Sequence, residues 1–153
     1  MHLRAPSPDE AELLTDLCLR SKAVWGYDAE FMQACRAELT IRPADLAPDT
    51  FRVATTIDDA IVGVVQIVLA GDDAELAKLF VAPGTIGTGI GKALFTWAAN
   101  EARNRGAMRL WIEADPGAAP FYRRMGATDA GVVPSGSIPG RCLPRLKLEL
   151  KQT

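Results

Sequence analysis

The sequence predicts an α/β fold built on a mixed β-sheet with helices on both faces. Short β-rich runs alternate with segments of helical periodicity along the chain. Three of the β-rich runs follow one another as a meander, and a crossover helix then leads to a further strand. The length of 153 residues fits one domain, residues 1–153, with a hydrophobic core. The expected order of elements is β-αα-βββ-α-β-α-ββ.

The first part of the chain predicts a short strand and two helices. Residues 2–5 can form the strand, and a capping box that begins at Ser7 starts the first helix. Gly26 should end this helix. Asp28 can cap the second helix, which continues until the Pro-rich loop at residues 43–48.

Three strands and a long helix are expected in the middle of the chain. The pair Asp58-Asp59 is a hairpin signal between the first two strands. The helix should begin near Gly89 and end at Gly106, because glycine is common just after a helix. The strands are predicted at residues 51–57, 61–69 and 74–81.

The last part of the chain predicts three more strands and one short helix. The dipeptide Asp115-Pro116 is an N-cap followed by a first helical residue, so it should open a helix that runs through Met125. A loop rich in Pro, Ser and Gly separates the final two strands. The strands are predicted at residues 108–114, 128–133 and 142–150.

The composition is ordinary for a globular protein, with 48% apolar and 24% charged residues. The formal net charge is −2, so no basic field indicates a nucleic-acid partner. No run approaches the roughly 18 apolar residues that cross a membrane, and the N-terminus does not resemble a signal peptide. Cys18, Cys35 and Cys142 match no metal or redox motif and are expected to be reduced, buried thiols of a cytoplasmic protein.

The most informative segment runs from Leu79 to Leu94, where an apolar strand enters a Pro/Gly-rich turn that opens directly into a helix. Gly87, Gly89 and Gly91 allow unusual backbone conformations and let a ligand approach the amides closely. Unpaired N–H groups and the positive end of the helix dipole coincide at this helix start. The segment therefore predicts a site for a phosphate or pyrophosphate.

Two widespread phosphate loops fit this segment poorly. A P-loop needs a first Gly where Ile86 stands and a hydroxyl where Ala93 follows Gly91-Lys92. A dinucleotide fingerprint needs Gly-x-Gly-x-x-Gly after the first strand and an acidic residue about twenty positions later. Here the spacing is Gly-x-Gly-x-Gly in mid-chain, and two arginines and an asparagine occupy residues 103–105. A Gly-rich turn without a ligand is the remaining alternative.

The same segment resembles the cofactor loop of the GNAT superfamily of N-acetyltransferases. In that family a strand ends in Val-x-Pro, and Gln/Arg-x-x-Gly-x-Gly/Ala then opens a helix. Residues Val81-Ala82-Pro83 and the run from Ile86 to Gly91 match, with Ile86 in place of the usual Gln or Arg. This departure is tolerable because the phosphates are held mainly by backbone amides.

A second segment, from Asp115 to Ala127, resembles the family's other signature, Asn-x-x-Ala-x-x-aromatic-Tyr-x-x-x-Gly-Phe. Asp115 replaces the Asn and Ala127 replaces the Phe. The two motifs and the order of elements extend the resemblance over essentially the whole chain. They imply a mixed, mostly antiparallel sheet flanked by helices. The positions in register are Ala118, Phe121, Tyr122 and Gly126.

The resemblance implies acetyl-CoA as the cofactor and no metal. In the family, the strand before the loop pairs its backbone with the pantetheine arm, and the loop amides bind the pyrophosphate. A solvated lysine at a helix start is an equally good interpretation of Lys92. The cofactor-binding residues carried over to this chain are Leu79, Phe80, Val81, Ile86, Gly87, Thr88, Gly89, Ile90, Gly91, Lys92, Asp115, Ala118 and Phe121.

Acetyl transfer to an amine needs a base, because a lysine-type amine has a pKa of about 10.4. We expect Glu75, on the strand before the loop, to be this base directly or through water. Glu113 and Asp115 are the other candidates. The family resemblance suggests that Tyr122 protonates the leaving thiolate. His2 is the only histidine, so a Ser-His or Cys-His nucleophile is excluded and direct transfer is expected.

Three residues are expected to contact the acceptor. Trp25 and Tyr27 lie between the first two helices, a segment that often lines the acceptor site in this family, and Arg141 lies in a late loop that often closes over it. They suggest a small-molecule amine that also carries an anionic group or a flat apolar part. A core Trp25 and a surface Arg141 are the alternative.

Two other functions are compatible with the same residues. One is a non-catalytic acyl-CoA-binding or regulatory module. The other is an acetyltransferase for a protein N-terminus or a lysine. Related folds often dimerise, so a homodimer is a further expectation.

Overall fold

The structure is a computed structural model, and it describes residues 1–151. Within these residues, three short 3-10 turns accompany the regular elements: η1 (Pro8–Glu10), which leads directly into the first helix, η2 (Pro43–Asp45) and η3 (Pro83–Thr85). The helices and strands are β1 (His2–Arg4), α1 (Ala11–Ala23), α2 (Ala29–Leu39), β2 (Phe51–Thr55), β3 (Ile61–Ala70), β4 (Asp73–Val81), α3 (Ile90–Asn104), β5 (Arg109–Glu113), α4 (Ala119–Arg124), β6 (Thr128–Pro134) and β7 (Cys142–Glu149).

The observed order of helices and strands is the predicted one, which confirms the fold class. Within residues 1–151, seven strands form one sheet in the order β1-β2-β3-β4-β5-β7-β6. The pair β4–β5 is parallel, whereas β1–β2, β2–β3, β5–β7 and β6–β7 are antiparallel. A mixed sheet results because the crossover through α3 returns the chain in the same direction.

The chain divides into two compact units, which we describe separately. Unit 1 contains Met1–Gln66 and Lys78–Phe95, and unit 2 contains Ile67–Ala77 and Thr96–Thr153. The sequence-based expectation of a single domain stays a prediction.

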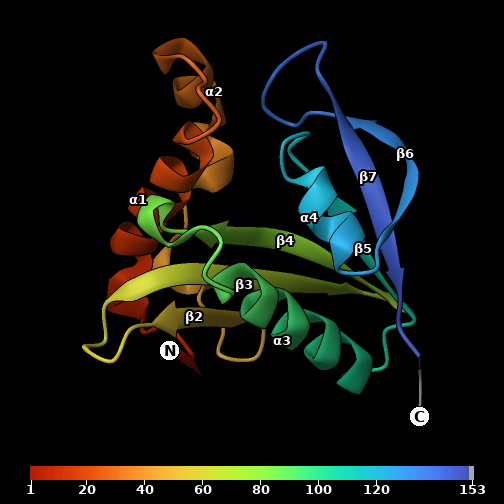
Figure 1. Ribbon diagram of the computed structural model, residues 1–153, viewed down its shortest axis with the longest axis horizontal. Coiled ribbons are helices and arrows are strands. Elements are labelled where there is room, and N and C mark those ends of the chain that lie inside the picture. The colour runs from red at the N-terminus through yellow and green to blue at the C-terminus, as the bar shows by residue number, and fades with distance from the viewer. Residues whose placement is uncertain (152–153) are drawn as a thin grey trace. The chain divides into compact units, whose positions relative to one another are not determined.

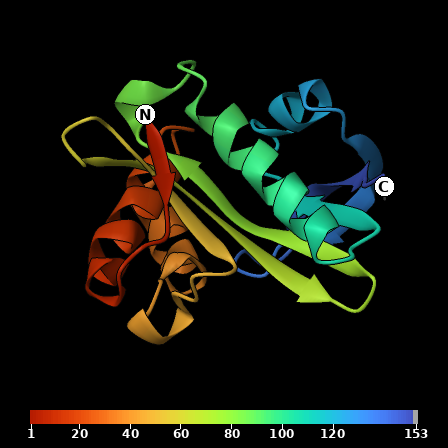
Figure 2. The same cartoon turned by 90° about the horizontal axis from the view of Figure 1, so that it is seen from below.

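Unit 1 packs two helices and an antiparallel set of strands around its core. β2 pairs with β1 from His2↔Thr55 and with β3 from Phe51↔Gln66. Helices α1 and α2 lie side by side (Figure 1 and Figure 2). The buried apolar side chains of these elements include Leu14, Leu17, Cys18, Cys35, Phe51, Val53, Val64 and Val65.

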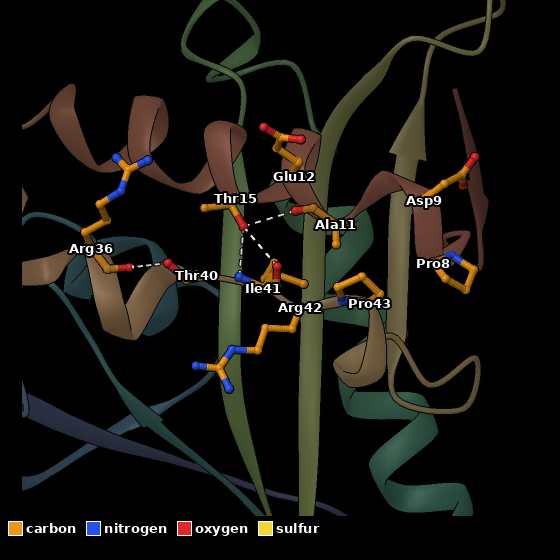
Figure 3. Close-up of a pocket in the computed structure, with 10 residues that line it drawn as sticks. All are labelled: Pro8, Asp9, Ala11, Glu12, Thr15, Arg36, Thr40, Ile41, Arg42 and Pro43. Atoms are coloured by element: carbon orange, nitrogen blue, oxygen red, sulfur yellow. Dashed lines mark hydrogen bonds between the residues drawn. The ribbon is translucent and has the colours of Figure 1, made fainter.

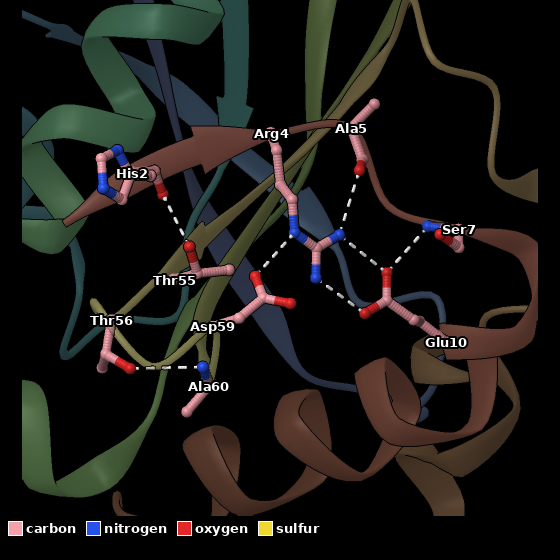
Figure 4. A network of polar contacts seen from close by, with 9 residues as sticks. All are labelled: His2, Arg4, Ala5, Ser7, Glu10, Thr55, Thr56, Asp59 and Ala60. Carbon is pink, nitrogen blue, oxygen red and sulfur yellow. Dashed lines mark hydrogen bonds and ion pairs between the residues drawn. The ribbon is translucent and has the colours of Figure 1, made fainter.

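A polar network joins β1 to the start of the first helical segment (Figure 4). The Arg4 guanidinium donates two hydrogen bonds of 2.9 Å to the Glu10 carboxylate and one of 3.1 Å to Asp59. The hydrogen bond from Arg4 lowers the pKa of the Glu10 carboxyl. Glu10 also accepts the Ser7 N–H at 2.8 Å. The predicted cap at Ser7 therefore opens η1, and α1 itself begins later, at Ala11.

Unit 2 places β5 between β4 and β7. The parallel register of β4 and β5 runs from Asp73↔Arg109 to Leu76↔Ile112, and β7 pairs antiparallel with β5 and β6. Helix α4 contacts β7 (Figure 1). The buried side chains of this unit include Ala74, Leu76, Leu110, Ile112, Ala119, Tyr122 and Leu146.

Several local signals behave as the sequence predicts. Asp28 caps α2 by accepting the Phe31 N–H at 2.8 Å. Gly26 and Gly106 follow α1 and α3 with φ values of 85° and 90°, which glycine adopts without strain. Cys142 is a correction, because it is exposed although a buried thiol was expected. Cys142 is the first residue of β7. The strand that pairs with it, β6, is itself largely exposed to solvent.

Candidate active site

The predicted phosphate loop begins where β4 ends in unit 1. The Ala82 N–H donates to the Val62 carbonyl at 2.8 Å, which anchors the end of the strand. Thr85 then folds η3 onto this point, because both its N–H and its hydroxyl donate to the Ala82 carbonyl, at 2.9 and 2.8 Å. The loop is therefore held at its base by hydrogen bonds before it reaches the glycines.

Gly87 and Gly89 make the turn into α3 with φ values of 86° and 89°. A Cβ placed at either residue would meet no atom within 4 Å, so both glycines border open space. Helix α3 begins one residue later, at Ile90, and its first helical hydrogen bond runs from the Ala93 N–H to the Gly89 carbonyl at 3.0 Å, so the N–H groups of residues 90–92 have no partner within the helix. A helix start with such amides is the kind of site that binds an anionic phosphate group, and this role of the loop stays a prediction.

Gly63 on β3 sets how closely the start of α3 approaches the strand. A Cβ on Gly63 would lie 2.7 Å from Leu94 Cδ1 and 3.0 Å from Ile90 Cγ2. Ile90 is the first residue of α3, so this contact positions the helix end that carries the loop amides. Sequence reasoning missed Gly63, although an isolated Gly inside a strand can signal a close approach of this kind.

In unit 2, the structure brings together Asp115 and Arg141. An Nη of Arg141 lies 3.5 Å from Asp115 Oδ2, and the two side chains are only 18% and 13% exposed. The Ser135 N–H donates to the Arg141 carbonyl at 2.7 Å, which closes the base of the loop between β6 and β7. The sequence analysis assigned Asp115 to the cofactor and Arg141 to the acceptor. It did not predict that the two side chains form an ion pair.

Asp115 does not cap α4, which corrects the predicted helix start. Its Oδ1 accepts the Gly117 N–H at 3.0 Å and so stabilises a turn over residues 116–118. The helix begins only at Ala119, with Ala118 at the N-cap position. The competing local Asx turn uses the carboxylate that a cap would need.

Tyr122, the expected proton donor, lies on α4 and is buried. Its ring contacts the edge of Phe121 at a centroid distance of 5.2 Å. Burial raises the pKa of the phenol, so this group keeps its proton across the neutral range. A protonated phenol can donate to a leaving thiolate.

Glu75, the expected base, lies on the exposed face of β4 in unit 2. It alternates with the buried residues Ala74 and Leu76, as the predicted strand phase requires. Its register partner on β5 is Trp111. Glu113, an alternative base, is also exposed, on the same strand as Trp111.

The aromatic residues expected at the acceptor site lie after α1 in unit 1. Trp25 is 47% exposed, so it is not a core residue. Tyr27 stacks on Phe31 with ring centroids 3.9 Å apart, and Lys22 Nζ lies 5.4 Å from the Tyr27 ring centroid. The Tyr27 ring is therefore already committed to one aromatic neighbour and one cation.

A pocket of about 490 Å³ lies elsewhere in unit 1 (Figure 3). Thr15 links two segments that line the pocket, α1 and the chain after α2. Its hydroxyl donates to the Ala11 carbonyl at 3.0 Å and accepts the Ile41 N–H at 2.8 Å. None of the predicted site residues lines it. The lining residues are Pro8, Asp9, Ala11, Glu12, Thr15, Arg36, Thr40, Ile41, Arg42 and Pro43.

The described part of the chain offers neither a cluster of metal ligands nor a membrane-spanning helix. No group of three or more His, Cys, Asp or Glu side chains within residues 1–151 is arranged to hold a metal ion. Each helix in this range is too short or too polar to cross a lipid bilayer.

Comparison with known proteins identifies the family. The model of the acetyltransferase (GNAT) family matches residues 16–127, and the chain belongs to this family. The predicted family is therefore confirmed. Membership of this family supports the enzyme class and the acetyl-CoA cofactor that the two motifs predict.

Three similar proteins illustrate the relationship. A streptothricin acetyltransferase from Streptomyces lavendulae is 49% identical over 55 residues, which cover 34% of this chain and only 29% of that protein. A crystal structure of nourseothricin acetyltransferase is 31% identical with a TM-score of 0.61, over 68% of this chain and 67% of that chain. The PaiA N-acetyltransferase of Thermoplasma acidophilum, solved with coenzyme A, shares the fold at 18% identity with a TM-score of 0.77, over 97% of this chain and 98% of that chain.

Proposed function

We propose that this protein transfers the acetyl group of acetyl-CoA to the primary amine of a small molecule. The observation that carries the proposal is the open glycine turn at Gly87 and Gly89, placed directly before the first amides of α3. Membership of the acetyltransferase family supports acetyl-CoA as the ligand of this turn. The similarity to proteins named for streptothricin and nourseothricin supports a small-molecule acceptor.

The proposed cofactor contacts follow from this turn. The amides of Gly87 and of Gly89 to Lys92 would hold the pyrophosphate, because a helix start concentrates N–H donors and positive potential. The Thr88 N–H, also predicted to bind, donates to the Thr85 carbonyl at 3.3 Å instead. The backbone of Leu79, Phe80 and Val81 would pair with the pantetheine arm as a strand does. Asp115, Ala118 and Phe121 are the proposed further contacts.

Bound acetyl-CoA would supply a thioester carbonyl carbon, at which the C–N bond forms as the C–S bond breaks. Glu75 would accept the proton that the amine loses, directly or through a water molecule. Tyr122 would donate its phenolic proton to the leaving sulfur, so that coenzyme A departs as a thiol. Burial of Tyr122 supports this assignment, because the phenol remains protonated until it is needed.

Calorimetric titration with acetyl-CoA, with ATP and NAD as controls, tests the cofactor proposal. We expect saturable binding of acetyl-CoA alone. A panel of amines then follows, with released thiol as the readout. Binding of none of the three compounds would remove the main support for the enzyme.

Two variants separate an enzyme from a non-catalytic acyl-CoA-binding module. Glu75→Gln and Tyr122→Phe should each lower kcat by about 10²-fold or more, the usual contribution of a positioned acid or base. Their affinity for acetyl-CoA should stay unchanged. Full turnover in both variants would reject the proposed mechanism. Turnover of peptides in preference to every small amine would favour a protein N-terminal or lysine acetyltransferase instead.

A further inference from the structure

The exposed face of the sheet in unit 2 carries a row of charged and aromatic side chains. Strand register places Glu75 opposite Trp111 across the β4–β5 pair, and Glu113 opposite Arg145 across the β5–β7 pair. Residues that face each other in paired strands project to the same side of a sheet. The intervening residues Leu110, Ile112 and Leu146 are buried on the other side.

Most of the other charges on this face are already neutralised by neighbours. Asp73 accepts a hydrogen bond of 3.2 Å from Arg109 Nε and one of 3.1 Å from the indole N–H of Trp111. Lys147 Nζ lies 3.5 Å from the Glu149 carboxylate. Neither Glu75 nor Glu113 has an ion-pair partner among residues 1–151.

Arg145 is the exception among the cations of this face. Its guanidinium carbon lies 4.0 Å from the centroid of the Trp111 ring, so the indole holds the planar group flat. Its Nε is buried and has no hydrogen-bond partner in the described part of the chain. Although Glu113 faces Arg145 in the register, no ion pair joins them. Burial keeps Nε out of reach of a ligand, whereas neither Nη atom is among the buried atoms of residues 1–151 without a partner, so a bound oxygen anion can reach the guanidinium at its two Nη atoms.

We propose that Arg145 binds an anionic group of the acceptor, so that the acceptor is a primary amine that also carries a carboxylate or a phosphate. This inference rests on the proposed function. The planar guanidinium can offer its two Nη atoms side by side to two oxygens. The sequence interpretation placed this role on Arg141, but that side chain is paired with Asp115.

The charges on the face match such an acceptor. Arg145 lies two strands away from Glu75 across the sheet and two residues away along the strand direction. With the usual distance between strands and the usual rise per residue, their Cα atoms are about 12 Å apart. The long side chains at both ends shorten the remaining gap to the size of a small molecule. The amine would then lie toward Glu75, and the anion toward Arg145. A purely cationic acceptor would be opposed by the Arg145 charge.

Matched pairs of acceptors test the inference. 4-Aminobutanoate is compared with its neutral amide, and phosphoethanolamine with ethanolamine, each with acetyl-CoA and thiol release as the readout. We expect the anionic member of at least one pair to have a kcat/KM about 10- to 100-fold higher than that of its neutral partner. Charge-assisted hydrogen bonds contribute a binding free energy of this size. The pair with the larger ratio distinguishes a carboxylate from a phosphate ligand.

Variants then locate the effect. Arg145→Gln should raise KM for the anionic acceptor by about 10-fold or more and leave the neutral amine unchanged. Arg145→Lys should lose less, because it keeps the charge but not the bidentate geometry. Lys147→Gln is the matched control on the same strand and face, and it should leave the ratio unchanged.

The outcomes separate the inference from the function on which it rests. Equal turnover of both members of each pair by the wild-type protein would overturn the inference and leave the acetyltransferase intact. An equal loss for charged and neutral acceptors in Arg145→Gln would also overturn it, since that result indicates a structural role. Absence of acetyl-CoA-dependent turnover with every amine would overturn both.

Discussion

The substitution Gly63→Ala tests whether close packing at β3 positions the end of α3 at which we propose that phosphate binds. The new methyl group would lie 2.7 Å from Leu94 Cδ1, 3.0 Å from Ile90 Cγ2 and 3.4 Å from the Phe80 carbonyl oxygen. Leu94 is fully buried, so its side chain has no solvent space into which it can rotate. Either Leu94 must repack against its buried neighbours, or the strand and the helix must move apart.

The expected magnitude combines two opposing terms. Overpacking a core costs about 1–3 kcal/mol. Replacing Gly by Ala restricts the unfolded chain, which offsets about 0.4–1 kcal/mol of this cost. We expect a net loss of about 0.5–2 kcal/mol in the free energy of unfolding, or about 1–8 °C in Tm for a chain of this size. Acetyl-CoA should also bind more weakly, because Ile90 begins the helix that carries the loop amides.

Urea unfolding of four proteins measures this effect: wild type, Gly63→Ala, Leu94→Ala and the double variant. Leu94→Ala removes the atom closest to the new methyl group, so Gly63→Ala should cost less than about 0.5 kcal/mol in that background. Gly84→Ala is the control, because a Cβ there meets no atom within 4 Å and its φ is not positive. Equal losses in both backgrounds would refute the proposed contact.

Three further predictions follow from individual side chains. Gly89→Ala should weaken acetyl-CoA binding about tenfold in calorimetry, since a φ of 89° costs a non-glycine residue about 1–2 kcal/mol and the new methyl group enters the open turn. A normal affinity would show that the turn binds no ligand. The raised pKa of Tyr122 predicts a pH effect, because its phenol ionises in the unfolded chain from about pH 10 but resists ionisation when folded. Stability should therefore fall as the pH rises above about 10, and Tyr122→Phe should reduce this decline in thermal melts compared at pH 8 and 11. Arg141→Ala should lower the free energy of unfolding by about 1–3 kcal/mol, because Asp115 loses its partner in a mostly buried pair. A rise in KM for an anionic acceptor that exceeds the rise in Arg145→Gln would return the anion site to Arg141.

Local signals predicted the elements of this fold well, because their physical causes lie within a few residues. The Asp28 carboxylate needs only the Phe31 N–H three residues later. The positive φ at Gly106 ends α3 whatever surrounds it. The turn at Gly87 and Gly89 is equally local, so the sequence alone located the proposed pyrophosphate site and, through the two motifs, the family.

Tertiary structure decided which side chains meet. Asp115 and Arg141 are separated by a helix and a strand, and their ion pair exists only because the β6–β7 loop folds back. The contact of Arg145 with Trp111 depends on the register of β5 and β7. A shift of one residue would turn every side chain of β7 to the other face, and periodicity along one strand does not determine that register. The sequence therefore determined the proposed cofactor loop, whereas long-range strand pairing decided the residues proposed to select the acceptor.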